Sequence, residues 1–242
     1  MQVMVAESAG FCYGVKRAVD MARETAKKCR HSVMLGSIIH NANVVAELEA
    51  LGMRKVDSWD QVRPGETVVI RSHGERKEVF ERLEAMGAAC VNATCPNVLR
   101  IQQLVAQAQE EGRTPLIIGE MHHPEVLGAA SWSERSVILP GPRELENWLN
   151  EEPSRRNMPL TATAQTTCVQ GIWESSKEIL KKQCTNAKIF DTICNATHRR
   201  QTEAAELAAQ VDVMVVVGDR KSANTKHLAE ICREKCGRVV QI

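Results

Sequence analysis

Three cysteines, Cys12, Cys95 and Cys194, occur in the same local setting along the chain. Each follows a short apolar run, lies in a loop of small residues and precedes a helix-like segment. Thiolates are soft ligands that suit iron–sulfur clusters, zinc or copper(I). Because three thiolates leave a fourth metal position open, the pattern predicts a metal centre to which a substrate can bind.

The other six cysteines are more simply interpreted as small buried hydrophobic residues. Cys232 and Cys236 are also one helical turn apart, which is compatible with a weak pair of metal ligands. The remaining four lie in or beside apolar segments: Cys29, Cys90, Cys168 and Cys184.

Polar side chains follow the predicted strands, at the positions where α/β proteins bind ligands. His40, His73 and His123 each come shortly after a strand-like run. Imidazoles, hydroxyls and amides near helix amino termini donate hydrogen bonds to phosphate without a large positive charge. We therefore predict an anion site, to which two further strand ends contribute Gln165, Thr166, Thr167, Ser222 and Asn224.

Glu125, in the sequence HHPE, is the one carboxylate of this group. Beside a soft metal and several imidazoles, it is placed to transfer protons and not to bind phosphate. The chain has neither GxGxxG after a strand nor GxxxxGK[ST], which argues against a dinucleotide or a nucleoside triphosphate as the ligand. HHPE also differs from the HExxH motif of zinc hydrolases.

Apolar runs of strand length alternate with amphipathic stretches of helix length, which is typical of α/β architecture with parallel sheets. Between residues 120 and 160 we expect a loop and short helices. The predicted strands cover residues 1–6, 32–38, 67–72, 88–93, 115–120, 160–164, 187–192, 211–218 and 237–242, and the predicted helices cover 15–29, 43–51, 78–87, 98–112, 172–182, 200–210 and 223–236.

The overall composition excludes several classes of protein. A net charge of +1, the absence of a basic run and an aromatic content of 3% argue against nucleic-acid binding. The first residues lack the features of a secretory signal. No apolar run approaches the roughly 18 residues of a membrane span. We expect a cytoplasmic protein that does not bind membranes, in which the nine cysteines are thiols or metal ligands.

The three cysteines divide the chain into three units. We expect lobe 1 over residues 13–94, lobe 2 over 95–193, and a third lobe formed by 194–242 together with 1–12. In a closed ring, this third unit is shorter than the others by about 20 to 40 residues, enough for another strand and helix. The expectation is that the sequence is an incomplete copy of a longer protein, because a chain ending on strand residues leaves an edge unpaired.

Eight motifs occur in the order GFCYGVKRA, IIHNANVV, RSHGE, NATCPNV, HHPEV, AQTT, ICNATHRRQ and GDRKSANT. With these motifs the whole chain resembles the 4-hydroxy-3-methylbut-2-enyl diphosphate reductases of the non-mevalonate isoprenoid pathway. The resemblance implies an α/β fold in which three lobes, with mostly parallel sheets, form a pseudo-threefold cloverleaf around a central iron–sulfur cluster.

The resemblance also implies roles for individual residues. Cys12, Cys95 and Cys194 match the ligands of a [4Fe–4S] cluster with one open iron. Glu125 matches the proton donor, with the Thr166 hydroxyl in the same relay and His123 as a further catalytic residue. The substrate-binding positions match His40, His73, His123, Thr166, Ser222, Ala223 and Asn224.

In that family, the hydroxyl of an allylic diphosphate is removed as water to give isopentenyl and dimethylallyl diphosphate. A reduced ferredoxin or flavodoxin supplies the electrons. This chain departs from the family in two places. Ala223 stands where a second serine is usual, which removes a side-chain donor but leaves the backbone amide. A phosphate-binding loop of the Ser-Ala-Pro type does not occur within the 242 residues.

Two alternatives remain open at the level of sequence. One is a non-catalytic iron–sulfur protein of the same fold with a redox or sensing role, and the other is a zinc-binding α/β module. The presence of Glu125, Thr166 and the three histidines argues against both, because neither alternative needs these groups.

Overall fold

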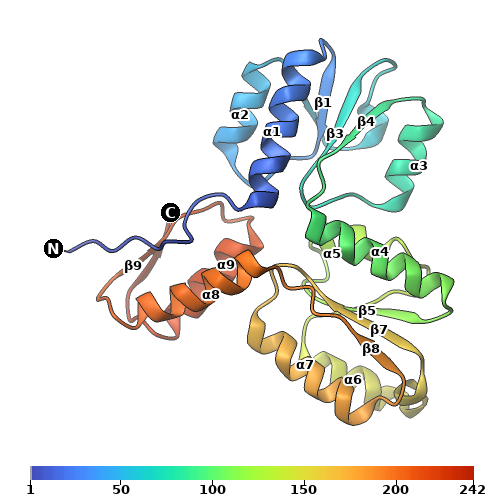
Figure 1. Ribbon diagram of the computed structural model, residues 1–242, viewed down its shortest axis with the longest axis vertical. Helices are drawn as coiled ribbons and strands as arrows, with labels where there is room; N and C mark the ends of the chain where they lie inside the picture. The colour runs from blue at the N-terminus through green and yellow to red at the C-terminus, as the bar shows by residue number, and fades with distance from the viewer. Residues whose placement is uncertain (1) are drawn as a thin grey trace.

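The computed structural model describes residues 2–242. Figure 1 shows the helices and strands in three groups arranged around a common centre, towards which the amino ends of α1, α4 and α8 point. We refer to α1 through β4 as lobe 1, to α4 through β8 as lobe 2 and to α8 through β10 as lobe 3. All paired strands in the described residues run parallel, which confirms the predicted α/β class.

Lobe 1 is a four-stranded sheet in the order β2-β1-β3-β4, with helices on both faces. Met34 and Val69 face α1 and α2, whereas their neighbours Val33 and Val68 face α3. Successive side chains of each strand therefore point into two different cores on opposite faces of the sheet. This explains the continuous apolar runs of β1 and β3. The elements are α1 (Tyr13–Lys28), β1 (Ser32–Leu35), α2 (Ala42–Ala50), β2 (Arg54–Val56), η1 (Trp59–Gln61), β3 (Thr67–Ile70), α3 (Lys77–Ala85) and β4 (Ala89–Asn92).

Lobe 2 repeats this topology with the order β6-β5-β7-β8. Leu116 of β5 packs in a core with Trp173 of α7, and the adjacent Ile117 packs on α4 and α5. The two central strands β5 and β7 are buried over their whole length. The elements are α4 (Pro96–Glu110), β5 (Thr114–Ile118), α5 (Pro124–Ala130), β6 (Val137–Leu139), α6 (Pro142–Glu151), η2 (Pro153–Asn157), β7 (Leu160–Ala164), α7 (Gln170–Gln183) and β8 (Ala187–Ile189).

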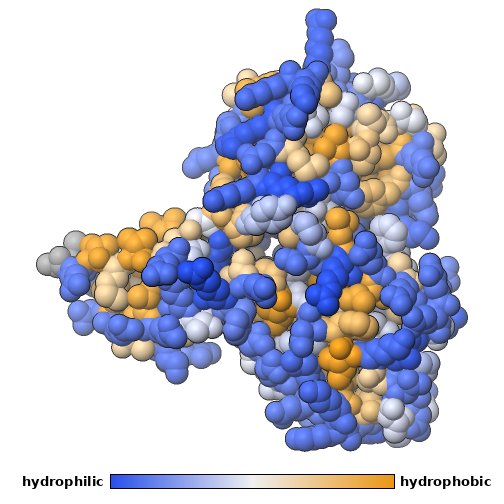
Figure 2. Space-filling view, viewed as in Figure 1, coloured by the Kyte–Doolittle hydropathy of each residue, from blue (hydrophilic) through white to orange (hydrophobic). Residues whose placement is uncertain are grey.

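Lobe 3 is smaller, with a two-stranded sheet in the order β10-β9. Its helices pack through small side chains, including Ala204 of α8 and Ala229 of α9. Val215 and Val217 are 51% and 76% exposed, and Figure 2 shows hydrophobic residues on the surface of this lobe. The elements are α8 (Asn195–Ala208), β9 (Met214–Val216), α9 (Ala223–Arg233) and β10 (Val239–Gln241).

The strand predicted over residues 1–6 is wrong for residues 2–6, which belong to no strand; residue 1 lies outside the described part. The chain that follows is held by side chains of α8. Glu203 accepts hydrogen bonds from the backbone N–H groups of Glu7 and Ser8, and Arg200 donates to the backbone oxygen of Ser8. These contacts hold Glu7 and Ser8 against α8, whereas no strand pairs with residues 2–6.

Two short strands, β2 and β6, were missed by the sequence analysis. Each forms an edge of its four-stranded sheet and is three residues long. Arg54 and the three residues of β6 are partly buried, Lys55 is exposed and Val56 is buried. A strand with one neighbour and one partly solvated face needs no long apolar run, so it leaves little signal in the sequence.

Candidate functional site

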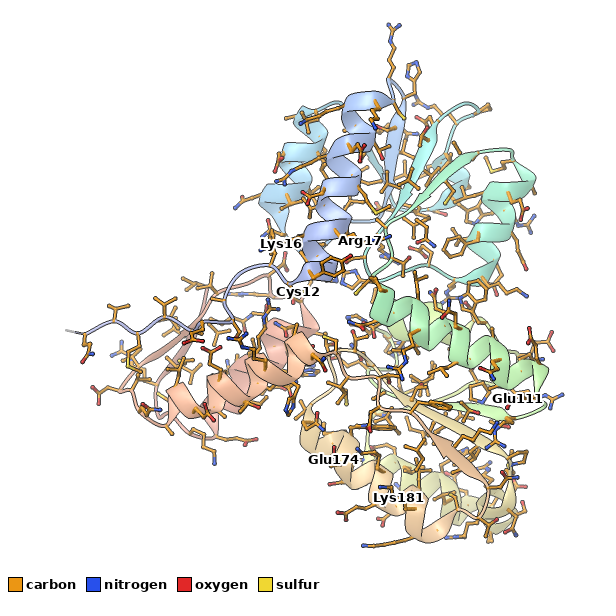
Figure 3. All side chains as sticks on the ribbon, viewed as in Figure 1. Cys12, Lys16, Arg17, Glu111, Glu174 and Lys181 are labelled. Carbon is orange, nitrogen blue, oxygen red and sulfur yellow. The ribbon has the colours of Figure 1, made fainter. Side chains whose placement is uncertain are left out.

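The three cysteines singled out by the sequence each occupy the N-cap of a long helix: Cys12 of α1, Cys95 of α4 and Cys194 of α8. In Figure 3, Cys12 lies where the lobes meet, close to Lys16 and Arg17. Arg17 Nη1 donates to the backbone oxygen of Thr94 at 3.1 Å, which ties the first turn of α1 to the loop that carries Cys95.

Cys95 lies directly against the start of α1. A Cβ atom on Gly14 would lie only 2.5 Å from Cys95 Sγ, so glycine is needed for this approach. Burial raises the pKa of the Cys95 thiol; backbone N–H groups of Asn97 and Val98 oppose this, whereas the thiols of Cys12 and Cys194 reinforce it. Cys95 is thus near enough to both other thiols for their charge to act on it.

The donor set fits an anionic, thiolate-bound group. Each sulfur belongs to a helix N-cap, where exposed N–H groups and the helix dipole favour negative charge. Cys194 Sγ already accepts a hydrogen bond from Thr197 N at 3.3 Å. Within residues 2–242, no three His, Cys, Asp or Glu side chains are grouped closely enough around a point to hold a single metal ion.

The three predicted histidines come together across two lobes. The rings of His40 and His73 have centroids 4.5 Å apart, and His73 lies 5.7 Å from His123. His40 and His73 follow β1 and β3, and His123 follows β5. These strands adjoin the point where the order of each sheet reverses, so their loops diverge and leave room for a ligand.

Two of these rings contain buried nitrogens without a hydrogen-bond partner in the described residues, His40 Nε2 and His73 Nδ1. His123 Nδ1 instead accepts from Glu125 N at 3.2 Å, which caps α5. This bond leaves the proton on Nε2 of a neutral His123 ring. Buried polar atoms normally have partners, so the two open nitrogens indicate a ligand site.

All three imidazoles favour the neutral form. Burial holds the pKa of His73 well below its ordinary value, helped by His40, His123 and Arg71. Burial lowers the pKa of His123 to about 4, with Glu120 opposing the shift. Burial also lowers the pKa of His40. Neutral rings can offer N–H donors to an anion and leave positive charge to Arg71, whose guanidinium pairs with Glu75 at 2.6 Å.

Glu125 is 2% exposed and lies on α5 beside Thr166. Thr166 donates twice to its carboxylate: the backbone N to Oε1 at 2.6 Å and Oγ1 to Oε2 at 2.8 Å. Burial raises the pKa of Glu125 to about 7, although both hydrogen bonds oppose the shift. A carboxyl group with this pKa can exchange a proton near neutral pH.

Thr166 also connects Glu125 to one of the three cysteines. Its backbone oxygen accepts from Cys194 N at 3.1 Å, while its N–H and hydroxyl bind Glu125. One residue at the end of β7 therefore fixes the distance between the predicted proton donor and the predicted metal centre.

The residues expected from lobe 3 lie at the amino end of α9. Ser222 Oγ caps the helix by accepting from Thr225 N at 3.3 Å, and Ala223 is buried. Within residues 2–242, no hydrogen bond links Ser222, Ala223 or Asn224 to the histidines. A cavity of about 370 Å³ separates this loop from lobe 1, lined by Ser37, His40, Asn41, Ala42, Val45, Ala46, Glu49, Lys55, Asp219 and Lys221.

Three charged or polar groups at this site were missed by the sequence analysis: Arg71, Glu120 and His227. Arg71 lies within the predicted RSHGE motif, and Glu120 ends the predicted strand before His123. His227 lies on α9, one turn beyond Ser222, and meets Glu120 in space. Arg71 and Glu120 could have been predicted as site residues from their positions at strand ends. The contact of His227 depends on how the lobes pack, so the sequence does not indicate it.

The six remaining cysteines were interpreted as small buried hydrophobic residues, and one of them is exposed in the structure. Cys168, Cys232 and Cys236 are buried, and Cys236 Sγ donates to the backbone oxygen of Val211 at 3.5 Å. Cys90 is exposed, which corrects the expectation that it is buried. It belongs to the edge strand β4, whose first two residues are exposed.

Comparison with known proteins gives a consistent result. The model of the LytB protein family matches residues 3–242. A relative in Caldanaerobacter subterraneus, a 4-hydroxy-3-methylbut-2-enyl diphosphate reductase, is 38% identical over 98% of this chain and 82% of its own length. One in Anaeromyxobacter with the same name is 40% identical over 96% of this chain and 82% of its own.

Two solved structures resemble the fold over nearly the whole chain. One is an (E)-4-hydroxy-3-methyl-but-2-enyl diphosphate reductase, 34% identical with a TM-score of 0.72, covering 99% of this chain and 85% of that one. The other, the corresponding reductase of Plasmodium falciparum, is 25% identical with a TM-score of 0.88, and the match covers 96% of this chain and 73% of that one.

Among residues 2–242, no helix is long and apolar enough to cross a membrane.

Proposed function

We propose, from the fact that this chain belongs to the LytB protein family, that it is a 4-hydroxy-3-methylbut-2-enyl diphosphate reductase. The reaction adds two electrons and two protons to the allylic alcohol, breaks its C–O bond and releases water. Protonation of the allyl fragment at one of two carbons gives isopentenyl or dimethylallyl diphosphate. The family is iron–sulfur dependent, and a bound cluster would pass the electrons to the substrate and act as a Lewis acid.

Cys12, Cys95 and Cys194 are the residues that would hold a [4Fe–4S] cluster in this chain. Support comes from their shared position at the N-caps of α1, α4 and α8, and from the close approach of Cys95 to Gly14. Three thiolates leave one iron of such a cluster without a protein ligand.

The diphosphate would bind to His40, His73 and His123 from lobes 1 and 2, and to Ser222, Asn224 and the backbone amide of Ala223 from lobe 3. The open nitrogens of His40 and His73 support this assignment, as does the Nε2 proton of His123. Neutral imidazole donors bind a polyanion without the desolvation of several buried cations.

The observation that carries the proposal is the pair formed by Glu125 and Thr166. Glu125 is buried and can hold a proton near pH 7, and Thr166 orients both carboxylate oxygens while bonding to the backbone of Cys194. In the proposed reaction, Glu125 delivers the proton with which the hydroxyl leaves as water, and the Thr166 hydroxyl belongs to the same relay. His123, whose Nδ1 accepts from Glu125 N, completes the catalytic group.

We further propose domain boundaries and an electron donor. Residues 13–94 and 95–193 would form two lobes, and 194–242 a third together with 1–12, since Ser8 is bonded to Glu203 of α8. A reduced ferredoxin or flavodoxin would supply the two electrons.

The test is anaerobic purification, iron and sulfide analysis, and turnover of the allylic diphosphate with a chemical reductant. We expect about four irons per chain by the ligand pattern of a [4Fe–4S] cluster, and product from the wild-type protein. Cys95→Ser should lose the cluster or its activity, because a hydroxyl is a poor substitute for thiolate. Cys232→Ser is the control and should keep its iron. Full iron content and turnover in Cys95→Ser would refute the proposal, and a cluster without turnover in the wild type would favour a non-catalytic redox protein.

A further inference from the structure

Arg71 begins the turn that carries His73, and its side chain contacts the last two residues of the same turn. Nε donates to the backbone oxygen of Gly74 at 3.4 Å, and Nη2 forms an ion pair with Glu75 Oε1 at 2.6 Å. The backbone closes the turn as well, because Gly74 N donates to the backbone oxygen of Arg71 at 3.0 Å. His73 therefore lies in the middle of a turn, residues 71–75, whose first side chain binds its end.

The guanidinium of Arg71 also fills the space beside the loop that leads to His40. A Cβ atom on Gly36, at the end of β1, would lie 3.0 Å from Arg71 Nη1, and Gly36 has a φ of +68°. Ser72 N donates to the backbone oxygen of Ile38 at 3.0 Å, which joins the two loops directly. The side chains of Arg71 and Glu75 are 22% and 11% exposed, so water screens this ion pair less than one at the surface.

On its other side, the turn packs against two helices of lobe 2. The backbone oxygen of Glu75 accepts from Gln102 Nε2 of α4 at 3.4 Å, and a Cβ atom on Gly128 of α5 would lie 3.2 Å from the same oxygen. Gly74 has a φ of +75°, and its Cβ would lie 2.7 Å from Gln102 Nε2. The turn is thus fixed between the loop of His40 and α5, the helix that His123 caps.

Arg71 offers two properties to this site, its charge and the shape of its guanidinium. Burial lowers the pKa of His40, His73 and His123, and the charge of Arg71 adds to the shift at each ring. A lysine would supply the same charge. The ammonium of a lysine is a single point, however, whereas the planar guanidinium contacts Gly74, the carboxylate of Glu75 and the space beside Gly36 at once.

We propose that Arg71 is a positioning residue that, through the shape of its guanidinium, closes the turn of residues 71–75 and so places His73 between His40 and His123 for the diphosphate. The inference rests on the proposed function. Without the side-chain contacts, backbone bonds alone hold the turn, and the open Nδ1 of His73 meets the ligand less often. Because the diphosphate is bound equally in the ground state and the transition state, the loss should raise KM and leave kcat unchanged.

The experiment compares Arg71→Met and Arg71→Lys with wild type, all loaded with cluster. We expect both variants to have a KM roughly tenfold above wild type with kcat unchanged, the effect of losing one hydrogen bond to a charged group. The Kd for inorganic diphosphate, measured by calorimetry, should rise by the same factor. Arg76→Met and Arg76→Lys are the controls, because Arg76 is exposed and its side chain does not cap α3. A wild-type KM in Arg71→Lys would show that Arg71 acts by charge alone and would overturn the proposal.

Glu75→Gln separates shape from charge a second time. It removes the ion pair that holds the guanidinium and leaves the charge of Arg71 without a partner carboxylate. Positioning predicts weaker binding of inorganic diphosphate and little further loss when Arg71→Met is added, since both changes break the same contact. Tighter binding in Glu75→Gln, or losses that add fully in the double variant, would contradict positioning.

Hydrogen–deuterium exchange of residues 70–76 provides a readout that needs neither turnover nor ligand. The amides of Ser72 and Gly74, which bond to Ile38 and Arg71, should lose protection in Arg71→Met and Arg71→Lys and keep it in the Arg76 variants. Equal protection in all of these proteins would overturn the inference. If wild type neither turned over the allylic diphosphate nor bound inorganic diphosphate but showed the expected exchange pattern, the proposed function would be refuted and the role of Arg71 in closing the turn would stand.

Discussion

Lobes 2 and 3 begin in the same way, with a cysteine at the N-cap of a long helix, but they position their functional groups by different means. In lobe 2, the fully buried strands β5 and β7 carry His123 and Thr166 at their ends, and hydrogen bonds within the lobe fix Glu125. In lobe 3, β9 and β10 are short, Val217 is 76% exposed, and α9 meets lobe 2 through His227.

This difference separates two ways of building a site. Groups that transfer a proton need precise placement, which a well-packed core provides. Groups that bind a large anion can tolerate a helix that is held by a few polar contacts between lobes. The proposed site would therefore join a chemical half from the buried core of lobe 2 to a binding half, part of which comes from α9 of lobe 3.

The prediction with the largest expected effect concerns turnover after replacement of Glu125, the proposed proton donor. We expect Glu125→Gln to keep the cluster and lose turnover by about 10²–10⁴-fold, because an amide has a similar shape and cannot relay a proton. Turnover per intact cluster is the measurement, and Glu134→Gln, at an exposed carboxylate, is the control. Normal turnover per cluster in a less stable Glu125→Gln protein would mean that Glu125 only stabilises the start of α5.

The second prediction compares the two cores directly. Trp173 is 1% exposed in lobe 2, and its Nε1 donates to Asp191 at 2.7 Å. Trp173→Ala should lower the free energy of unfolding by about 3–5 kcal/mol. Val215→Ala in lobe 3 should change it by less than about 0.5 kcal/mol, since Val215 is 51% exposed. Chemical denaturation measures the loss of unfolding free energy in each variant. Equal losses in the two variants would contradict the contrast between the lobes.

The third prediction uses the raised pKa of Glu125. Because the pKa of about 7 in the folded protein exceeds the ordinary value of 4.5, the folded state binds this proton more tightly than the unfolded state. The stabilisation is complete below pH 4.5 and is lost as the pH rises through 7. Relative to Glu125→Gln, wild type should lose roughly 2–3 kcal/mol of stability between pH 5 and pH 8. The measurement is chemical denaturation of both proteins at matched cluster content. A difference in unfolding free energy that stayed constant with pH would contradict the burial argument.

Much of lobes 1 and 2 could be predicted from the sequence, because burial on both faces of a parallel sheet produces long apolar runs. Thr67–Ile70 and Leu160–Ala164 lie within the predicted strands. His73, after the first, lies beside His40, and Thr166, after the second, donates to Glu125. The edge strands β2 and β6 were missed because each has one neighbour and partly solvated side chains.

What the sequence could not reveal depends on packing between lobes. Residues 2–6 have the composition of a strand, but no neighbouring strand pairs with them, so their apolar side chains stay exposed. The contact of His227 with Glu120 joins positions more than a hundred residues apart, and nothing in the local pattern around either residue indicates it. The periodicity of apolar residues along the chain indicates which side chains are buried. Contacts between lobes depend instead on how whole lobes are arranged.

The smallest effect concerns the imidazoles that lobe 1 contributes to the binding half. The ring of His73 is partly buried, and its buried Nδ1 has no partner in the described residues, so this polar atom does not stabilise the unbound protein but could bind a diphosphate. We therefore expect His73→Leu to preserve the free energy of unfolding while weakening substrate binding by roughly 1.5–3 kcal/mol, the typical contribution of a hydrogen bond to a charged group. Calorimetric titration of the cluster-loaded protein with inorganic diphosphate measures the loss, and His122→Ala, at an exposed histidine, is the control. If His73→Leu bound diphosphate as tightly as wild type, His73 would be a residue of the lobe 1 core, and the anion site would have to be sought at the amino end of α9 alone.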